Sequence, residues 1–536
     1  MPLRVAIVGS GVSGLAALWT LQQQQRQHNE DKIEVNLYEA DERVGGHTLT
    51  VPWRNLSKAG GITMVDIAFT LFNKLTYPNF TSFLNHLNIP ALPMRITFGL
   101  SRDNGQFEWS STSLSTLFAQ RRNLLSPSVW RMLFDIWRFN LFATDILLSN
   151  DKQSDKKDTK TKQEEESVGA YLDRNNYSSA FRDNYLIPLA SSIWVNNPDQ
   201  TLNSIPILML VSYFKNHLLL NSSFSDKGGV QWLVIKDGAQ QYVDRILEGL
   251  PRENLHLSTP IIKIESESPI SGKDSPLLLH TADGSIERFD RVVVATAGDE
   301  ALRILGDRAT FDERRILGCF KTSPSKVFLH SDTSFMPRNR KAWAAWNYHD
   351  FSTSGPSGPL VSLTANLNDL PGQDISITGP ILTTLNPPRA PDPWSIQGTF
   401  YFRHPVYDSA SMQAQNELHH IQGRRNIWFA GAWMREGFHE HGFTTGVKAA
   451  MDICPEVKLP FPITDCLIPE EEMRRSRNEG YNLSWLMRLL RFGTDSIQSS
   501  IILALSIQRF MVLLFGVLYL KCFVTPRARS KAKAIS

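Results

Sequence analysis

Three glycines near the start of the chain have the spacing that the phosphates of a dinucleotide require. The segment reads Gly9, Ser10, Gly11, Val12, Ser13 and Gly14, and it follows an apolar run at residues 5–8. In such a segment the first glycine permits a tight turn, the second lets the backbone approach a pyrophosphate, and the third lets a helix pack on the strand. The helix that follows points its free N–H groups at the phosphates. The sequence therefore predicts a dinucleotide cofactor at this turn.

A carboxylate and a second glycine loop follow the first turn. Glu39 ends the next apolar run, residues 33–38, where a carboxylate can accept hydrogen bonds from both ribose hydroxyls. The loop behind it contains Arg43, Gly45, Gly46 and His47. Taken alone, this loop is compatible with a surface turn after an ordinary dinucleotide-binding unit.

A third glycine-rich stretch occurs near residue 440. Gly431, Gly437 and Gly446 follow a hydrophobic strand and precede a helix start that is rich in small residues. A strand, a glycine turn and a helix N-terminus together form a site at which the helix dipole can face a phosphate or a ring. The sequence therefore predicts a second contact with the cofactor here.

Four side chains are candidates for moving a substrate proton or lining its pocket. His439 and Glu440 lie in the third glycine-rich stretch, where a neutral imidazole or a carboxylate could act as acid or base. Hydrogen bonds to the turn backbone are their alternative role. Lys326 begins an apolar strand, and an exposed strand-end lysine is the favoured interpretation of it. His404 could line a substrate pocket or be a buried, hydrogen-bonded histidine.

Composition excludes several other functions. The 536 residues suffice for two domains, and 42% hydrophobic with 20% charged residues is typical of a globular protein. The net charge of +3 gives no argument for nucleic acid. Four scattered cysteines indicate a reducing compartment. The pairs His419-His420 and His439-x-His441 lack metal-ligand spacing, so no metal is predicted.

The loop from Arg43 to Gly46 resembles the RxGG segment of amine-oxidase-like FAD enzymes. In those proteins the arginine and the two glycines approach the FAD diphosphate and ribitol, which implies FAD rather than a nicotinamide cofactor. The stretch from Gly431 to Gly446 resembles the helix start that faces the flavin N1/C2 edge. The strand that Lys326 begins is similar to one whose lysine holds a water beside flavin N5.

From about Val5 to Ala450 the chain resembles one branch of the flavin amine oxidase superfamily. Its members are predicted FAD/NAD-binding proteins of bacteria and fungi, and a related domain precedes the methyltransferase in plant cyclopropane fatty acid synthases. The matching runs lie at residues 65–79, 117–124, 384–387, 404–407 and 437–440. The chain departs from the branch at Ala68, Ala297 and His441, where glycine, histidine and aspartate are usual.

The resemblance implies an α/β fold with a discontinuous, Rossmann-like FAD-binding domain, an α+β substrate domain of amine-oxidase type and a hydrophobic C-terminal helical tail. The FAD-binding domain is expected at residues 1–75, 225–305 and 420–455. The helical and substrate parts are expected at 76–224, with a disordered loop at 151–167, and at 306–419. The tail occupies 456–536.

The tail has an apolar stretch at about residues 499–520, interrupted by Gln508 and Arg509. It predicts membrane attachment, either as a span or as a helix lying on the surface. A helix docked on the protein body is the alternative. The catalytic body is expected on the cytoplasmic side, and a soluble cytoplasmic protein is the alternative localisation.

The expected function is that of an FAD-dependent oxidoreductase. Such an enzyme would take a hydride from a C–N or activated C–H bond of a hydrophobic substrate, either a lipid or a secondary metabolite. One alternative is a redox-neutral double-bond isomerase of unsaturated fatty acids. The other is a non-catalytic FAD-binding module that supports a partner enzyme.

Overall fold

A computed structural model describes most of the chain. The described residues are 2–28, 33–55, 61–147, 166–195, 197–217, 219–220, 231–267, 275–350, 362–464 and 484–519. The disordered loop predicted at 151–167 lies almost entirely outside these residues. The chain divides into two compact units, residues 1–467 and 468–536, and each is described by itself.

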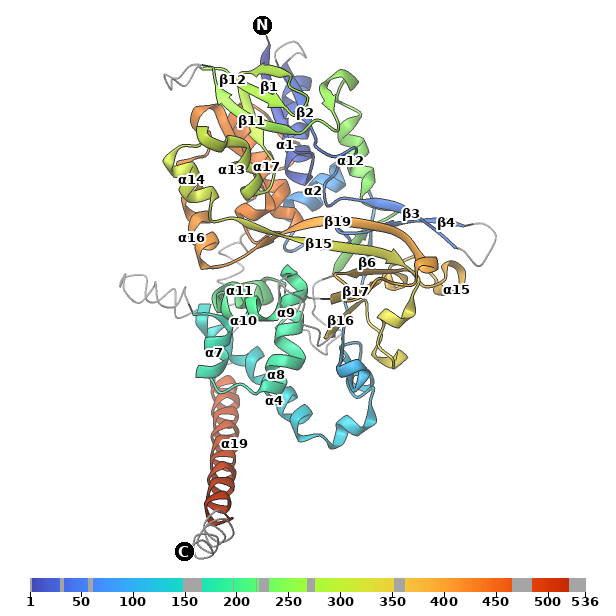
Figure 1. Cartoon of the computed structure of the whole chain (residues 1–536), viewed down its shortest axis with the longest axis vertical. Helices are drawn as coiled ribbons and strands as arrows, with labels where there is room; N and C mark the ends of the chain where they lie inside the picture. Colours follow the sequence, from blue (N-terminus) through green and yellow to red (C-terminus); the bar gives the residue numbers. More distant parts are fainter. Residues whose placement is uncertain are drawn as a thin grey trace, which may run out of the picture. The chain divides into compact units, whose positions relative to one another are not determined.

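A five-stranded parallel sheet forms one end of the first unit, at the top of Figure 1. Its order is β10 (Leu255–His256), β2 (Ile33–Tyr38), β1 (Leu3–Val8), β14 (Arg291–Val294) and β20 (Ile427–Phe429). Every neighbouring pair in this sheet is parallel. The end of β1 is buried on both faces, which is why it reads as an unbroken apolar run. The sheet is therefore assembled from segments that lie far apart in the sequence.

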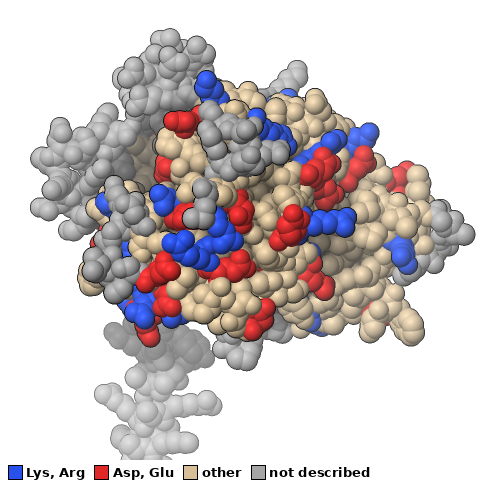
Figure 2. Space-filling model, turned by 90° about the horizontal axis from the view of Figure 1, so that it is seen from above, with Lys and Arg blue, Asp and Glu red and all other residues tan. Residues whose placement is uncertain are grey.

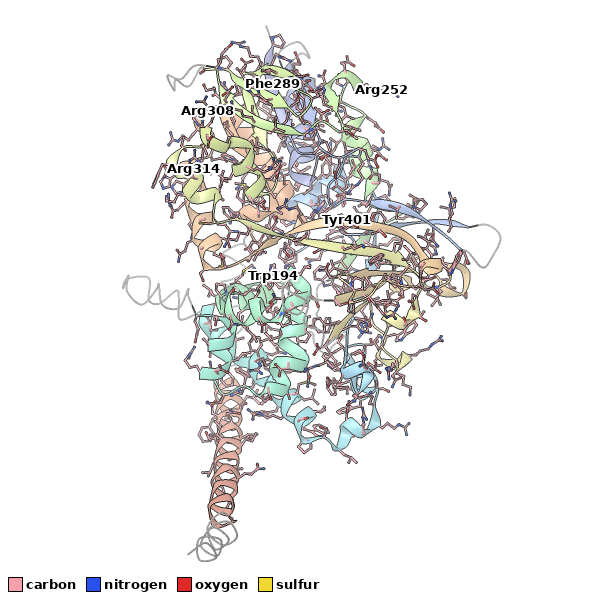
Figure 3. All side chains as sticks on the ribbon, in the orientation of Figure 1. Trp194, Arg252, Phe289, Arg308, Arg314 and Tyr401 are labelled. Atoms are coloured by element: carbon pink, nitrogen blue, oxygen red, sulfur yellow. The ribbon has the colours of Figure 1, made fainter. Side chains whose placement is uncertain are left out.

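Helices α1 (Val12–His28) and α17 (His439–Ile453) pack against each other beside this sheet. Helices α2 (Pro78–His86) and α12 (Gln240–Leu247) lie next to them. An antiparallel sheet of β11 (Ile261–Ser266), β12 (Leu277–Thr281) and β13 (Ile286–Phe289) adjoins α13 (Gly298–Leu305), which packs on α14 (Phe311–Leu317). Phe289 ends β13, and its ring lies 4.6 Å from the Arg4 guanidinium at this end of the unit (Figure 3).

A seven-stranded sheet crosses the middle of the first unit (Figure 1). Its order is β19 (Ile396–Val406), β15 (Lys321–His330), β18 (Leu382–Leu385), β17 (Ser362–Asn366), β16 (Trp346–Asp350), β7 (Phe98–Arg102) and β8 (Phe107–Ser110). All neighbours are antiparallel except β16 and β7. The long pair β15 and β19 spans the unit beneath the parallel sheet.

A group of helices covers the far side of the seven-stranded sheet, and we call it the cap. It contains α4 (Pro127–Phe142), α7 (Val168–Arg174), α8 (Ser179–Phe181), α9 (Ile187–Trp194), α10 (Pro198–Asn203) and α11 (Ile207–Asn216). Buried side chains of the cap and of β7 and β16 form one hydrophobic core. Trp194, at the end of α9, donates to the Glu436 carbonyl at 3.4 Å and so joins the cap to the turn before α17 (Figure 3).

The remaining elements are short. They are β3 (Thr50–Arg54), β4 (Ile62–Asp66), β5 (Phe72–Asn73), β6 (Ala91–Met94), β9 (Trp232–Ile235), α3 (Leu114–Leu117), α15 (Ile375–Thr378) and α16 (Ser409–Glu417). Strands β3 and β4 form a hairpin, and β5, β9 and β6 form a small antiparallel sheet. The second unit contains α19 (Ser484–Tyr519), which includes nearly all of the apolar stretch predicted at 499–520. Of the helices in the described ranges, none combines the length and apolarity needed to cross a bilayer.

Candidate active site

The three glycines of the first turn have different roles. Gly9 and Gly14 allow close packing, and Gly11 faces the space for a ligand. Gly9 has a φ of +101°, and a Cβ atom there would lie 2.8 Å from the Ala295 carbonyl oxygen. A Cβ on Gly14 would lie 1.9 Å from the Gly9 carbonyl oxygen, so Gly14 lets α1 start close to β1. A Cβ on Gly11 would meet nothing within 4 Å. Gly11 therefore faces open space, as a residue that lets a pyrophosphate approach the backbone should.

Glu39 holds this turn in place from the end of β2. Its Oε2 accepts from the Ser10 backbone N–H at 2.8 Å and from the Ser10 hydroxyl at 2.5 Å. Its Oε1 accepts from the Asp41 backbone N–H at 3.0 Å. The carboxylate is thus fixed beside the glycine turn, at the edge where the sequence predicts contact with the ribose.

The second glycine loop lies directly against the first. The Gly45 N–H donates to the Ser10 carbonyl at 3.0 Å, and the Arg43 guanidinium donates to the Gly46 carbonyl at 2.7 Å. A Cβ on Gly46 would lie 3.0 Å from the Gly11 Cα atom. Two glycine backbones thus face each other across the opening, and any larger residue at position 46 would press on Gly11.

The three glycines of the third glycine-rich stretch differ in whether they line the site. Gly431 and Gly437 line the same cavity as the two loops, and Gly437 has a φ of +88° with the Tyr407 hydroxyl close by. Gly446 lies inside α17, where a Cβ would meet the Ser13 carbonyl oxygen at 2.0 Å. Gly446 therefore allows α17 to pack on α1 and does not itself line the cavity.

One cavity of about 480 Å³ connects these loops with the cap. Its phosphate end is lined by Gly11, Ser13, Gly45, Gly46 and Ala295. Its cap end is lined by Phe98, Leu189, Ile193, Tyr213, Leu219 and Trp346. Among the described lining residues, none is Asp, Glu or Lys, and the one permanent charge is the half-exposed guanidinium of Arg403. The cavity therefore offers a backbone cradle at one end and an apolar chamber at the other.

Three histidines line the cavity, and burial keeps each of them neutral. His47 exposes its ring to the cavity but is enclosed by protein, and desolvation, assisted by Arg43, lowers its pKa to about 4. Desolvation and the neighbouring His47 lower the pKa of His404 to about 3. The two rings lie 5.3 Å apart, and the Ser325 hydroxyl is 3.0 Å from His404 Nδ1.

The third of these histidines, His439, is the first residue of α17. Its ring stacks on Phe69 with centroids 3.6 Å apart, and its Nε2 lies 3.0 Å from the Tyr242 hydroxyl. The Tyr242 hydroxyl in turn lies 2.5 Å from that of Thr48. Desolvation, then the charge of His47 when protonated, lowers the pKa of His439 well below its usual value. The imidazole thus meets the cavity as a neutral group with a fixed ring plane.

Glu440 does not reach the cavity. Its carboxylate is fully buried and accepts from the backbone N–H groups of Asn79 at 3.0 Å and Phe80 at 2.8 Å. These N–H groups belong to the first turn of α2, where an anion is favourable. Glu440 therefore binds backbone N–H groups, as in the alternative role, but these belong to α2 and not to its own turn.

Lys326 lies on the exposed face of the pair β15 and β19. Its ammonium is 4.6 Å from the Phe328 ring and 5.7 Å from that of Tyr401, which Figure 3 labels. No lysine is among the described residues that line the cavity. The structure does not bring Lys326 to the other candidates, because strand alternation turns its side chain outward.

Several lining residues carry no sequence motif. Arg403 pairs with Asp299 at 2.6 Å and, with Thr322, lies at the cavity edge beside His404. Register explains this group, because Thr322 stands opposite Pro405 in the β15–β19 ladder. The cap-end residues come from helices whose apolar spacing predicts burial but not which cavity they line. No signal in the sequence would have distinguished them from ordinary core residues.

Comparison with known proteins gives the class. Residues 12–391 match the flavin containing amine oxidoreductase family, which is well over half of the chain, and the chain belongs to that family. Its cofactor is FAD, and the open space at Gly11 between two glycine loops fits a bound diphosphate. No curated protein matches the sequence.

Solved structures share the fold. A CLA-producing fatty acid isomerase from P. acnes is 15% identical with a TM-score of 0.55, covering 84% of this chain and 99% of that one. Cyclohexylamine oxidase from Brevibacterium oxydans IH-35A is 16% identical with a TM-score of 0.55, covering 85% and 99%. Putrescine oxidase bound to putrescine is 14% identical with a TM-score of 0.57, covering 85% and 100%.

Proposed function

We propose that this protein is an FAD-dependent oxidoreductase that takes a hydride from a C–N or activated C–H bond of a hydrophobic substrate. The observation that carries the proposal is the single cavity that joins the glycine cradle to the cap. Its cap end is apolar, and no described lining residue is a carboxylate that could pair with the ammonium group of a small polar amine. A lipid or another hydrophobic metabolite suits this chamber better.

The residues that would hold the diphosphate and ribose of FAD lie around the phosphate end. Gly11 and Gly46 leave room for the diphosphate, and Glu39 stands where it can accept from the ribose. The parallel sheet and α1 behind them would then act as a Rossmann-like domain. FAD, when bound, supplies the hydride acceptor, and dioxygen would take up the two electrons afterwards.

His404 is the group that we assign to the substrate proton. Ser325 fixes its Nδ1, which leaves Nε2 as the atom that can exchange a proton with a substrate in the cavity. The depressed pKa keeps the imidazole unprotonated throughout the neutral range, so the Nε2 lone pair is available to a substrate proton, and it makes His404 a weak base. His47, in ring contact with His404, orients it. His439 is tied to Tyr242 and would position the cofactor edge instead.

A redox-neutral isomerase of unsaturated fatty acids is the second candidate. Arg403 favours it, because its guanidinium pairs with Asp299 and, with five N–H donors, can also bind the carboxylate at the end of a long apolar chain. In that reaction the hydride would leave one carbon and return to another, so no dioxygen would be consumed. The apolar chamber is compatible with both reactions.

Flavin spectra under anaerobic conditions separate these functions. An oxidoreductase substrate would bleach the flavin absorbance until oxygen is admitted, whereas an isomerase substrate would bleach it only transiently and yield a shifted double bond. A non-catalytic module would show no bleaching with any member of a panel of unsaturated fatty acids and hydrophobic amines. Purified protein without flavin absorbance would overturn the proposal as a whole.

We also propose that the tail attaches the protein to a membrane surface. Helix α19 exposes Leu489, Phe492, Ile497, Leu503 and Ile507. A helix lies on a lipid surface without spanning it when its apolar side chains enter the headgroup region and its polar and basic side chains stay in water. Removing residues 484–536 should then shift the protein from membrane to soluble fractions. An unchanged distribution would contradict this attachment.

A further inference from the structure

Helix α4 of the cap is apolar on two faces, although only one of them packs on the protein. Its inner face buries Val129, Met132, Ile136 and Phe139 in the cap core. On its outer face, Trp130 and Trp137 are 53% and 41% exposed, and they stand two turns apart on the same side of the helix. The outer face of a surface helix is normally polar. This helix therefore presents an apolar stripe to its surroundings.

The turn before α4 extends this stripe. Leu124 and Leu125 are 46% and 88% exposed, and the Trp130 indole N–H donates to the Leu124 carbonyl at 2.8 Å. Phe134 lies between the two tryptophans, with its ring 6.2 Å from that of Trp137. We call Leu124, Leu125, Trp130, Phe134 and Trp137 the α4 patch. The Trp130 indole is fixed by this hydrogen bond, and the Phe134 and Trp137 rings contact each other.

A positive rim borders the α4 patch. Arg121 and Arg122 are exposed immediately before it, and the sequence has no Asp or Glu between Glu108 and Asp135. Asp135 is itself fully buried beside Arg131 and Arg138. The face of the molecule seen in Figure 2 differs, because acidic and basic side chains alternate there. The α4 patch thus combines exposed Trp and Leu with unbalanced arginine.

We propose that the α4 patch docks on an anionic lipid surface. Tryptophan and leucine enter the boundary between headgroups and acyl chains, while arginine pairs with lipid phosphates and carboxylates. A second copy of this chain is a poorer occupant, because a two-fold contact would set one arginine rim against the other. Helix α19 is also a poorer occupant, because its three arginines and one aspartate give it the same positive sign of charge as the arginine rim. The proposal is independent of the reaction that the enzyme catalyses.

Site-specific photocrosslinking in the full-length protein tests this docking. Leu125 is replaced by p-benzoylphenylalanine, and the matched control carries the same group in place of Trp394, which is 89% exposed outside the cap. Both proteins are irradiated with vesicles of phosphatidylcholine alone and with vesicles that contain about one third phosphatidylserine. A lipid adduct is expected at position 125 with the anionic vesicles, and severalfold less with neutral vesicles or at position 394.

Charge reversal provides the second measurement. In the background that carries the crosslinker at position 125, Arg121→Glu with Arg122→Glu should lower the lipid adduct at least about 30-fold at sub-saturating lipid, since the loss of two arginine charges alone accounts for that factor. Each other outcome overturns the proposal. An adduct to residues 484–519 would make α19 the occupant, and an adduct to a second chain would make the patch a dimer contact. No lipid adduct, or equal yields at both positions, would exclude specific docking.

Discussion

The two ends of the cavity are built by different means. At the phosphate end, backbone atoms of Gly11, Gly45 and Gly46 form the surface, and their positions follow from short motifs. At the cap end, side chains from β7, β16, α9 and α11 meet, although they are distant in sequence. A cofactor that is common to a family is met by backbone, and a substrate that differs between relatives is met by side chains. Cofactor recognition can therefore persist while substrate recognition changes.

The largest expected effect is at the phosphate end. Gly11→Val should abolish flavin binding but leave the unfolding free energy within about 0.5 kcal/mol, because the new side chain fills only open space. Flavin absorbance and thermal unfolding of the apoprotein measure both quantities. Gly14→Val is the matched control and should fail to fold, since even a Cβ would clash with Gly9. Retention of flavin by Gly11→Val would refute the assigned cradle.

A smaller effect is expected where the two ends meet. His404→Asn should slow anaerobic flavin reduction by about 10²-fold, because it removes the proposed proton acceptor. Flavin content should stay normal, since the hydrogen bond of His404 goes to Ser325 and its contact with the second glycine loop is limited to the His47 ring. His420→Asn, an exposed histidine outside the cavity, should react at the parent rate. If both variants reduce at the parent rate, another group takes the proton.

Glu440→Gln tests a buried residue that joins α17 to the start of α2 outside the cavity. The amide keeps one acceptor oxygen for the start of α2 and loses the charge, so unfolding should become easier by about 2 kcal/mol. Denaturant titration measures this change. Glu417→Gln, which removes only a surface ion pair with Arg315, should cost less than about 1 kcal/mol. A slower reaction in a variant of unchanged stability would instead make Glu440 catalytic.

Acid should weaken the seven-stranded sheet, because its strands contain three histidines, His330, His349 and His404, whose pKa values burial lowers. His330, in β15, accepts from the Asp332 N–H at Nδ1, and burial lowers its pKa from 6.5 to about 4. Between these values the unfolded chain binds more protons than the folded one, so this stability is complete above about pH 6.5 and is lost as the pH falls. Hydrogen exchange at pH 5 should rise in β15 and β18 relative to β1 and α1. Equal increases would contradict this prediction.

The smallest effect is expected at Lys326. Lys326→Met should change neither flavin content nor the rate of flavin reduction, and it should alter stability by less than about 0.5 kcal/mol, because the side chain lies on the exposed face of β15. Stopped-flow reduction under anaerobic conditions is the measurement. A large rate loss would show that the strand turns inward during turnover.

The sequence predicted the backbone parts of the site better than its side-chain parts. The three glycine stretches follow from spacing, because turn geometry and close approach depend on the local chain. Gly446 shows the limit of this reasoning. In the sequence, a glycine that allows two helices to pack cannot be distinguished from one that faces a ligand. Glu440 and Lys326 lie outside the cavity for a related reason. Glu440 binds the start of a helix that lies more than 350 residues away in sequence. Lys326 occupies a position of its strand at which side chains point outward.

The order of strands in the parallel sheet has a consequence for biosynthesis. Strand β20 pairs with β14, and α17 packs on α1. Both β20 and α17 leave the ribosome long after the first glycine turn. Translation at about 5–20 residues per second leaves the nascent chain with an unpaired edge at β14 until residues 427–453 arrive. An exposed parallel edge is prone to misassociation. The nascent protein should therefore depend on chaperones until its last segments emerge, and a chain truncated before residue 427 should aggregate rather than bind FAD.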